Sequence, residues 1–126
     1  MRAVGSTPPR VVVAGDDPPF LEFLRECLAA AGYRVVACGG WAAALAAIRA
    51  DPPDLILIDY LMPELDGLAG VRALQADPRL RIIPIVLLAG ADSPGPPGTP
   101  PTERNRVLAR SLLSTIRCLL ERRPAV

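Results

Sequence analysis

Residues 53–67 read PDLILIDYLMPELDG, and this stretch decides the fold. Between Asp54 and Asp59 every residue is apolar, and turn-forming residues follow within the next eight positions. A short run without polar alternation is typical of a strand that is covered on both faces, as the strands of parallel sheets are. We therefore expect Asp59 at the carboxyl end of a buried parallel strand.

The rest of the chain repeats strand and helix on either side of this stretch. Strands that alternate with helix-length segments imply right-handed crossovers, a doubly wound parallel sheet and helices on both of its faces. The pattern thus predicts an α/β fold, in which function lies at the carboxyl ends of the strands. The predicted strands are Arg10–Ala14, Arg34–Cys38, Asp54–Asp59 and Ile82–Leu88, and the predicted helices run from Pro18 up to Gly32, Trp41–Ala50, Leu68–Ala76 and Thr102–Arg123.

The last helix is separated from the rest by a tract of proline and glycine, PGPPGTPP at residues 94–101. Proline lacks an amide proton and fixes φ, so this tract predicts a connector. We expect an α/β core over residues 1–93, a connector over 94–101, and a long amphipathic helix within 102–126 that packs on the core or on a second subunit. The helix is rich in arginine, which we interpret as a solvated face, so nucleic acid is not an expected partner.

Composition excludes several classes of function. The chain has 126 residues, enough for one domain, and its formal charge is +1. Every basic residue is arginine and histidine is absent, which excludes imidazole metal sites, Ser/His and Cys/His dyads and a P-loop lysine. The near-neutral balance gives no global attraction to nucleic acid or anionic lipid.

Targeting signals and cysteine motifs are also missing from the sequence. No apolar run is long enough to span a bilayer, and the N-terminus is not that of a signal peptide, so we expect a cytoplasmic protein without membrane contact. Cys27, Cys38 and Cys118 lack CxxC spacing, which argues against disulfides and zinc. We expect all three to be buried as small apolar side chains.

Acidic residues follow two of the predicted strands. Asp16 and Asp17 follow the first strand, and Asp59 ends the third. If these strands are neighbours, the carboxylates converge at one edge of the sheet, where a hard cation such as Mg²⁺ would relieve their repulsion. The alternative is that they are solvated turn residues.

Several motifs occur together and in order: the acidic turn, Gly32-Tyr33, PDLILID over residues 53–59, MPELDG over 62–67, and Pro84 before the fourth strand. This combination resembles the bacterial two-component response-regulator receiver domain, over about residues 10–90. The resemblance implies a flavodoxin-like fold, normally with parallel strands ordered 2-1-3-4-5. The usual fourth helix and fifth strand are expected to be missing, because only the proline-glycine tract precedes the last helix.

The resemblance also implies roles for individual residues. Asp59 would be the phosphoacceptor, attacking a phosphohistidine or a small phosphodonor, a reaction that Mg²⁺ assists by neutralising the incoming oxygens. The implied partner is a sensor histidine kinase or another signalling protein. The implied metal ligands are Asp16, Asp17, Asp59 and the backbone carbonyl of Leu61, and the residues expected to shape the loop are Pro63 and Gly67.

Three departures from the family pattern weaken this site. Gly15 occupies the first acidic position, so Asp17 comes one residue late and Mg²⁺ binding is expected to be weakened. Ala89 stands at the switch position, where the family has a threonine or serine hydroxyl for the phosphoryl group. The lysine that follows the fifth strand in the family has no counterpart, and each lost hydrogen bond to a charged group removes about 1.5–3 kcal/mol.

Three hypotheses follow from these observations. The first is a stand-alone, atypical receiver module without enzymatic turnover, which acts largely through protein contacts and forms a homodimer through the fourth-strand edge and the C-terminal helix. The second is a fully phosphorylation-dependent response regulator in which arginine replaces the lost lysine. The third, which we rank lowest, is a Mg²⁺-dependent phosphatase.

Overall fold

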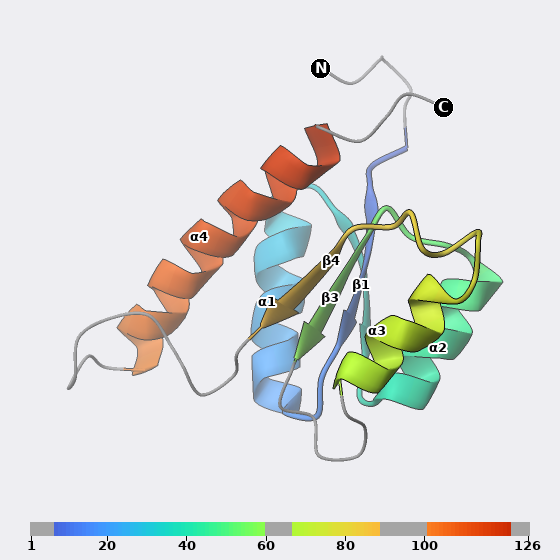
Figure 1. Cartoon of the computed structure of the whole chain (residues 1–126). Helices are drawn as coiled ribbons and strands as arrows, with labels where there is room; N and C mark the ends of the chain where they lie inside the picture. Colours follow the sequence, from blue (N-terminus) through green and yellow to red (C-terminus); the bar gives the residue numbers. More distant parts are fainter. Residues whose placement is uncertain (1–6, 60–66, 89–100, 122–126) are drawn as a thin grey trace.

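The computed structural model describes residues 7–59, 67–88 and 101–121 of the chain. Within these residues four strands alternate with four helices (Figure 1). The elements are β1 (Arg10–Ala14), α1 (Pro18–Ala30), β2 (Arg34–Cys38), α2 (Trp41–Ala50), β3 (Leu55–Asp59), α3 (Gly67–Gln75), β4 (Ile85–Leu88) and α4 (Pro101–Glu121).

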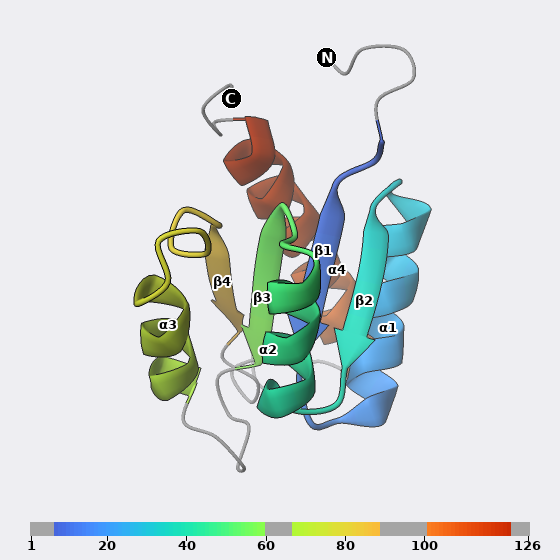
Figure 2. The same ribbon diagram turned by 90° about the vertical axis from the view of Figure 1, so that its right-hand side faces the viewer.

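The strands form one parallel sheet in the order β2-β1-β3-β4. Helices α2 and α3 cover one face of this sheet, and α1 and α4 cover the other (Figures 1 and 2). The predicted doubly wound α/β architecture is therefore confirmed, as is the order of the first four strands that the resemblance implied.

The alternating side chains of the central strands divide the core into two clusters. Val12 and Ile56 face α2 and α3, where they pack with Ile48 and Leu74. Their neighbours in sequence face the opposite side, packing with α1 and α4. Both faces are apolar because both are covered, which is why β1 and β3 read as uninterrupted apolar runs. The members of the second cluster that are buried are Val11, Val13, Leu21, Leu24, Leu28, Leu55, Leu57, Leu112 and Ile116.

The backbone properties of proline and glycine explain where helix α1 begins and ends. Pro18 and Pro19 open it, where a missing amide proton costs no hydrogen bond. Gly32 follows its C-terminus with a φ of 96°, a left-handed conformation that glycine adopts without strain. The N–H of Tyr33 then donates to the carbonyl of Leu28 at 3.1 Å, which closes the turn into β2.

Strand β4 begins three residues later than the sequence predicted. Residues before it form turns, with the N–H of Leu80 donating to the carbonyl of Asp77 and that of Ile83 donating to Leu80. Ile82, predicted to open the strand, is 75% exposed in this turn. The apolar run was misleading because Ile83 lies in the turn and is nevertheless buried. Pairing with β3 starts only at Pro84, whose carbonyl accepts the N–H of Ile56.

The cysteine prediction was correct for only one of the three residues. Cys38 is buried at the end of β2, whereas Cys27 is half-buried and Cys118 is exposed. Cys118 is on the solvent side of α4, because the apolar stripe of that helix is formed by Leu112, Ile116 and their helical neighbours. Among the described residues, no helix is long and apolar enough to cross a membrane.

Candidate functional site

The acidic turn follows β1 at the carboxyl edge of the sheet. The N–H of Gly15 donates to the carbonyl of Cys38 at 3.1 Å, which holds the end of β1 against the end of β2. Asp16 and Asp17 come next, and both are exposed. Asp17 is the N-cap residue of α1, and its carbonyl accepts the N–H of Leu21 at 2.9 Å. The turn therefore presents two adjacent carboxylates at the end of a central strand.

Neither carboxylate is used by the fold within the described residues. The Asp17 side chain makes no capping hydrogen bond, and the first two helical positions are prolines without an N–H. The hydrogen bonds and ion pairs among the described residues also leave out the side chain of Asp16. Carboxylates without a described partner are free to bind a cation at a phosphoryl site. The same arrangement is equally typical of a solvated turn.

The register of the sheet brings Asp59 to the same edge. Ala14 pairs with Ile58, so the backbone of Asp59 is level with Gly15, one residue before the acidic pair. On its other side Asp59 pairs with Leu88, the last residue of β4. The ends of β1, β3 and β4 all lie toward the bottom of the sheet in Figure 1. The sheet therefore brings together the backbone positions of the three predicted acidic residues.

The remaining predicted site residues are only partly covered. Leu61, Pro63 and Ala89 lie outside the described residues. Gly67 is the first residue of α3, directly after the connection from Asp59. Within the described part of the chain, no three acidic or cysteine side chains are grouped closely enough to hold a metal ion.

The available donor atoms fit a hard cation in type. Carboxylate oxygens are ligands that Mg²⁺ prefers, and it binds through one or two carboxylates while keeping several waters. Asp16 and Asp17 supply such oxygens in a solvent-accessible turn. No histidine exists in the chain, and burial raises the pKa of the Cys38 thiol near this edge, so softer ligands are not offered here.

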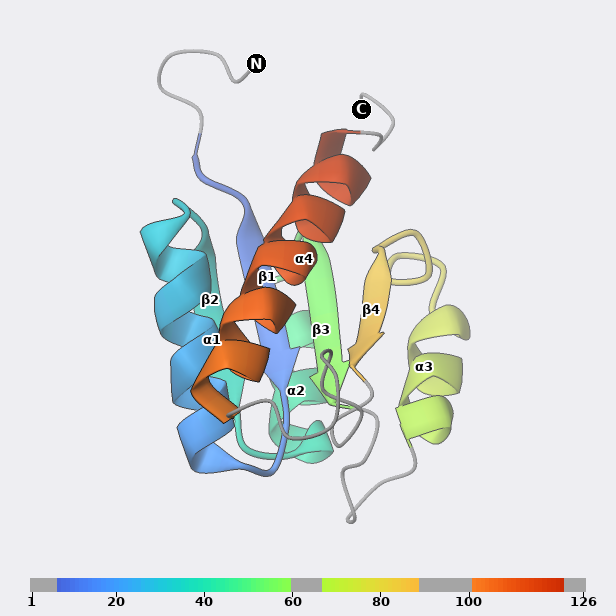
Figure 3. The same ribbon diagram turned by 90° about the vertical axis from the view of Figure 1, so that its left-hand side faces the viewer.

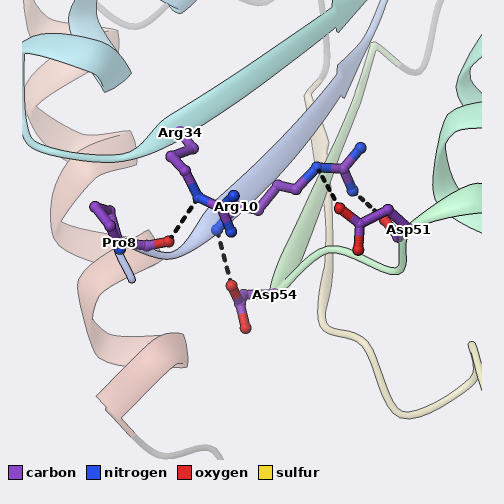
Figure 4. Close-up of polar contacts among 5 residues, drawn as sticks. All are labelled: Pro8, Arg10, Arg34, Asp51 and Asp54. Carbon is purple, nitrogen blue, oxygen red and sulfur yellow. Dashed lines mark hydrogen bonds and ion pairs between the residues drawn. The ribbon is translucent and has the colours of Figure 1, made fainter. Parts of the chain in front are cut away.

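A second group of acidic residues lies at the opposite end of the sheet and has a structural role (Figure 4). The carboxylate of Asp54 accepts the backbone N–H of Arg10 at 2.8 Å, and the N–H of Asp54 donates to the Arg10 carbonyl at 2.8 Å. The Arg10 guanidinium donates to the carbonyl of Asp51 and lies 3.6 Å from its carboxylate. This network ties the start of β3 to the start of β1.

The neighbouring strand is held in a similar way at that end. The Arg34 guanidinium donates to the carbonyl of Pro8 at 3.0 Å (Figure 4). The backbone N–H of Arg34 donates to the carbonyl of Pro9 at 2.9 Å. These contacts are not predicted by the sequence. The only available signal was the DPPD motif before β3, whose prolines do not reveal which arginine the flanking aspartates contact.

Comparisons with known proteins agree with this arrangement. Residues 11–94 match the family model described as the response regulator receiver domain. The chain is 37% identical over 86 residues to the response regulator PleD of Caulobacter vibrioides, covering 68% of this chain and 19% of that protein. It is also 37% identical over 79 residues to the DNA-binding response regulator MtrA of Mycolicibacterium smegmatis, covering 63% and 33%. The chain thus spans well under two thirds of these relatives.

Solved structures give the same result for the fold. The signal receiver domain of a signal transduction histidine kinase from Syntrophus aciditrophicus is similar with a TM-score of 0.71 and 28% identity, covering 94% of this chain and 96% of that one. The chemotaxis response regulator CheY4 of Vibrio cholerae, at 21% identity, has the same fold with a TM-score of 0.71, covering 90% and 99%. The chain belongs to the response regulator receiver domain family, the signalling modules of two-component systems.

Proposed function

We propose that this receiver domain accepts a phosphoryl group on Asp59 and works mainly through protein contacts, as a signalling module of a two-component phosphorelay in the cytoplasm. A carboxylate oxygen of Asp59 would attack phosphorus, forming an oxygen–phosphorus bond. The bond from phosphorus to the donor, a histidine nitrogen or an acetate oxygen, would break with its electron pair leaving on the donor. The observation that carries this proposal is the register that sets Asp59 level with Gly15, beside the acidic turn.

Mg²⁺ is the proposed cofactor, and it would neutralise charge on the phosphoryl oxygens. Asp16, Asp17, Asp59 and the carbonyl of Leu61 would hold it. The exposed acidic pair supports this assignment because its oxygens have no other described partner. Because residue 15 is glycine, the turn has one carboxylate fewer than the family pattern, and we expect weak Mg²⁺ binding. Asp17, one residue after the second acidic position, would strengthen this binding.

A weakened switch is the reason for assigning the output to protein contacts. Ala89 has no hydroxyl, and the chain has no lysine, so two of the family's hydrogen bonds to the phosphoryl group are lost. Loss of such bonds to a charged group reduces the energy that phosphorylation can put into a conformational change. The proposed partner is a sensor histidine kinase or another signalling protein.

Intact-mass analysis after incubation with acetyl phosphate and Mg²⁺ tests the phosphoacceptor. We expect an adduct of one phosphoryl group in the wild type and none in Asp59→Asn. Asp16→Asn and Asp17→Asn should each slow its formation. The matched control is Asp51→Asn, an exposed aspartate at the far end of the sheet, which should react as the wild type does. An adduct that persists in Asp59→Asn would refute the assignment.

A homodimer through the β4 edge is part of the proposal. Among the described residues, β4 pairs only with β3, and Leu87 on this strand is 42% exposed. Helix α4 packs on the face of the sheet across β1 and β3, beside α1, rather than along the β4 edge (Figure 3). The proline-glycine tract offers few amide protons for a ladder, so a strand from a second copy is the better candidate to pair with this edge.

Sedimentation tests the dimer. We expect the wild type to associate at micromolar concentrations and Leu87→Glu to remain monomeric, because the substitution puts like charges into the interface. Ile82→Glu is the control, since Ile82 is more exposed yet lies in the turn before β4. A wild type that is monomeric throughout, or an equal effect of both substitutions, would contradict this interface.

The alternative, full phosphorylation dependence with arginine in place of lysine, has one observation in its favour. Helix α4 begins at the end of the molecule where the strands end, and it runs toward the opposite end (Figures 1 and 3). Arg104 and Arg106 are in its first turns, whereas Arg117 is near its far end. If arginine stabilises the phosphoryl group, Arg104→Gln or Arg106→Gln should shorten the lifetime of the adduct and Arg117→Gln should not.

A further inference from the structure

Helices α2 and α3 touch at a position where no side chain would fit. Trp41, the single tryptophan of the chain, opens α2 and is 2% exposed. A Cβ atom at Gly70 of α3 would fall 2.2 Å from Cε2, 2.3 Å from Cζ2 and 2.6 Å from Nε1 of its indole. Real Cβ contacts are never this short, so the α3 backbone lies directly on the ring only because residue 70 is glycine.

This contact is connected along the chain to both halves of the candidate site. Gly70 is in the first turns of α3, which begins at Gly67, and residues 60–66 connect that helix to Asp59. Trp41 follows β2, and the carbonyl of Cys38 at the end of β2 accepts the N–H of Gly15 before the acidic turn. The start of α2 is therefore linked through the chain to the acidic turn and through packing to the helix that follows Asp59.

The connection from Asp59 to α3 has one end set by the sheet and the other set by α3. At the sheet end, β3 pairs on both sides, with β1 and with β4. At the helix end, α3 packs on the α2 face of the sheet through Gly70, Val71 and Leu74. Of these contacts, the one with Trp41 is the nearest to Gly67. A shift of α3 at this point would change the separation of the two ends of the connection.

We propose that Trp41 and Gly70 act as positioning residues for the phosphoacceptor. The indole sets where α3 begins, at Gly67, relative to Asp59 at the end of β3. Reaction rates are sensitive to displacements of about 1 Å in such sites. The inference rests on the proposed phosphorylation of Asp59.

The test compares the rate of adduct formation with the stability of the fold. Gly70→Ala forces α3 away from the indole, and we expect the rate with acetyl phosphate and Mg²⁺ to fall about tenfold. Ile48→Val is the control: Ile48 is fully buried in the same cluster and on the same helix, but it is distant in sequence from the start of α2. We expect its rate to stay within about twofold of the wild type. Urea unfolding gives the stability of each variant, and rates are compared where all variants are folded.

A second variant separates positioning from simple damage to the fold. Trp41→Leu removes the indole atoms that the added methyl group would meet. The double variant Gly70→Ala/Trp41→Leu should therefore react faster than Gly70→Ala alone. Because Trp41 is the single tryptophan, its emission also reports on the contact: it should differ between the wild type and Gly70→Ala, in which the packing on the indole changes.

The outcomes distinguish this inference from the proposed function. An adduct in the wild type whose rate is unchanged in Gly70→Ala would overturn the positioning role alone. The same holds if rates in Gly70→Ala and Ile48→Val fall together in proportion to stability. Absence of any adduct in the wild type would overturn the proposed function and this inference together.

Discussion

Asp54 and Asp59 lie at the two ends of β3 and differ in their structural roles. Asp54 accepts the backbone N–H of Arg10, so it joins β3 to β1 at the start of both strands. Asp59 ends the strand at the opposite edge, level with the acidic turn. Two identical residue types five positions apart therefore belong to a structural network and to the candidate site, respectively.

Asp54 should contribute measurably to stability. In Asp54→Ala the part-buried N–H of Arg10 loses its carboxylate acceptor. The free energy of unfolding should fall by about 1–3 kcal/mol, the usual cost of leaving such a donor unsatisfied. Urea denaturation followed by circular dichroism measures this loss. Asp54→Asn keeps an acceptor oxygen and should lose less than half as much; equal losses in both variants would argue against the hydrogen bond as the cause.

At the scale of elements, the structure differs from the sequence prediction mainly in the connections and in the last helix. The turn between α3 and β4 is organised by Asp77, whose carboxylate accepts the N–H of Arg79 at 2.9 Å and whose carbonyl accepts the N–H of Leu80. Helix α4 reaches the core through one apolar stripe and leaves Arg110 and Arg117 exposed. Local hydrogen bonding thus decides the turn, and burial decides the helix.

The turn at Asp77 should make stability dependent on pH in the acidic range. The Arg79 N–H and guanidinium lower the pKa of Asp77 below its usual value. A lowered pKa means that the stabilisation is complete above the usual value, near pH 4, and is lost as the pH falls through the folded-state pKa. Unfolding measured between pH 6 and pH 2 should therefore show a smaller acid loss in Asp77→Asn than in the wild type. Identical acid profiles would remove Asp77 as a source of this dependence.

Helix α4 should be an integral part of the core. Ile116 is fully buried against the α1 face of the sheet, so Ile116→Ala should cost about 2–5 kcal/mol of unfolding free energy. Ser114→Ala, an exposed substitution two residues away on the same helix, should stay within about 0.5 kcal/mol of the wild type. Thermal and urea unfolding measure both variants. A negligible effect of Ile116→Ala would mean that α4 is not packed on the sheet in solution.

At the scale of the whole molecule, one sheet separates two cores. β1 and β3 contribute alternate side chains to each, so neither cluster exists without the same two strands. The polar network at Arg10 lies at the starts of β1 and β3, and the candidate site lies at their ends, so the two occupy opposite ends of this sheet.

Substitutions in the two cores should add. Ile48→Val on the α2 face and Ile116→Val on the α4 face each remove one buried methylene, at a cost of about 0.5–1.5 kcal/mol. The sheet lies between the two side chains, and they belong to different core clusters. The loss of unfolding free energy in the double variant should therefore equal the sum of the two single losses to within about 0.5 kcal/mol. Urea denaturation of the four proteins measures the coupling. A larger deviation would indicate that the two faces repack together.

The sequence by itself determined the order of the elements and the class of the fold. Uninterrupted apolar runs such as Val11–Val13 and Leu55–Ile58 can be satisfied only by strands covered on both faces, and the residues at 62–67 indicated the family. These features are local, so they can be read along the chain. The roles of Asp59 and the metal ligands remain predictions.

Only the tertiary structure decided which residues meet. The register that sets Asp59 level with Gly15, the pairing of Arg10 with Asp54, and the contact of Trp41 with Gly70 each join segments at least 29 positions apart. Ile82 was predicted to lie in a strand and Cys118 to be buried, and both predictions were wrong for the same reason. Burial and partnership depend on what packs against a residue from elsewhere in the chain, and local periodicity does not contain that information.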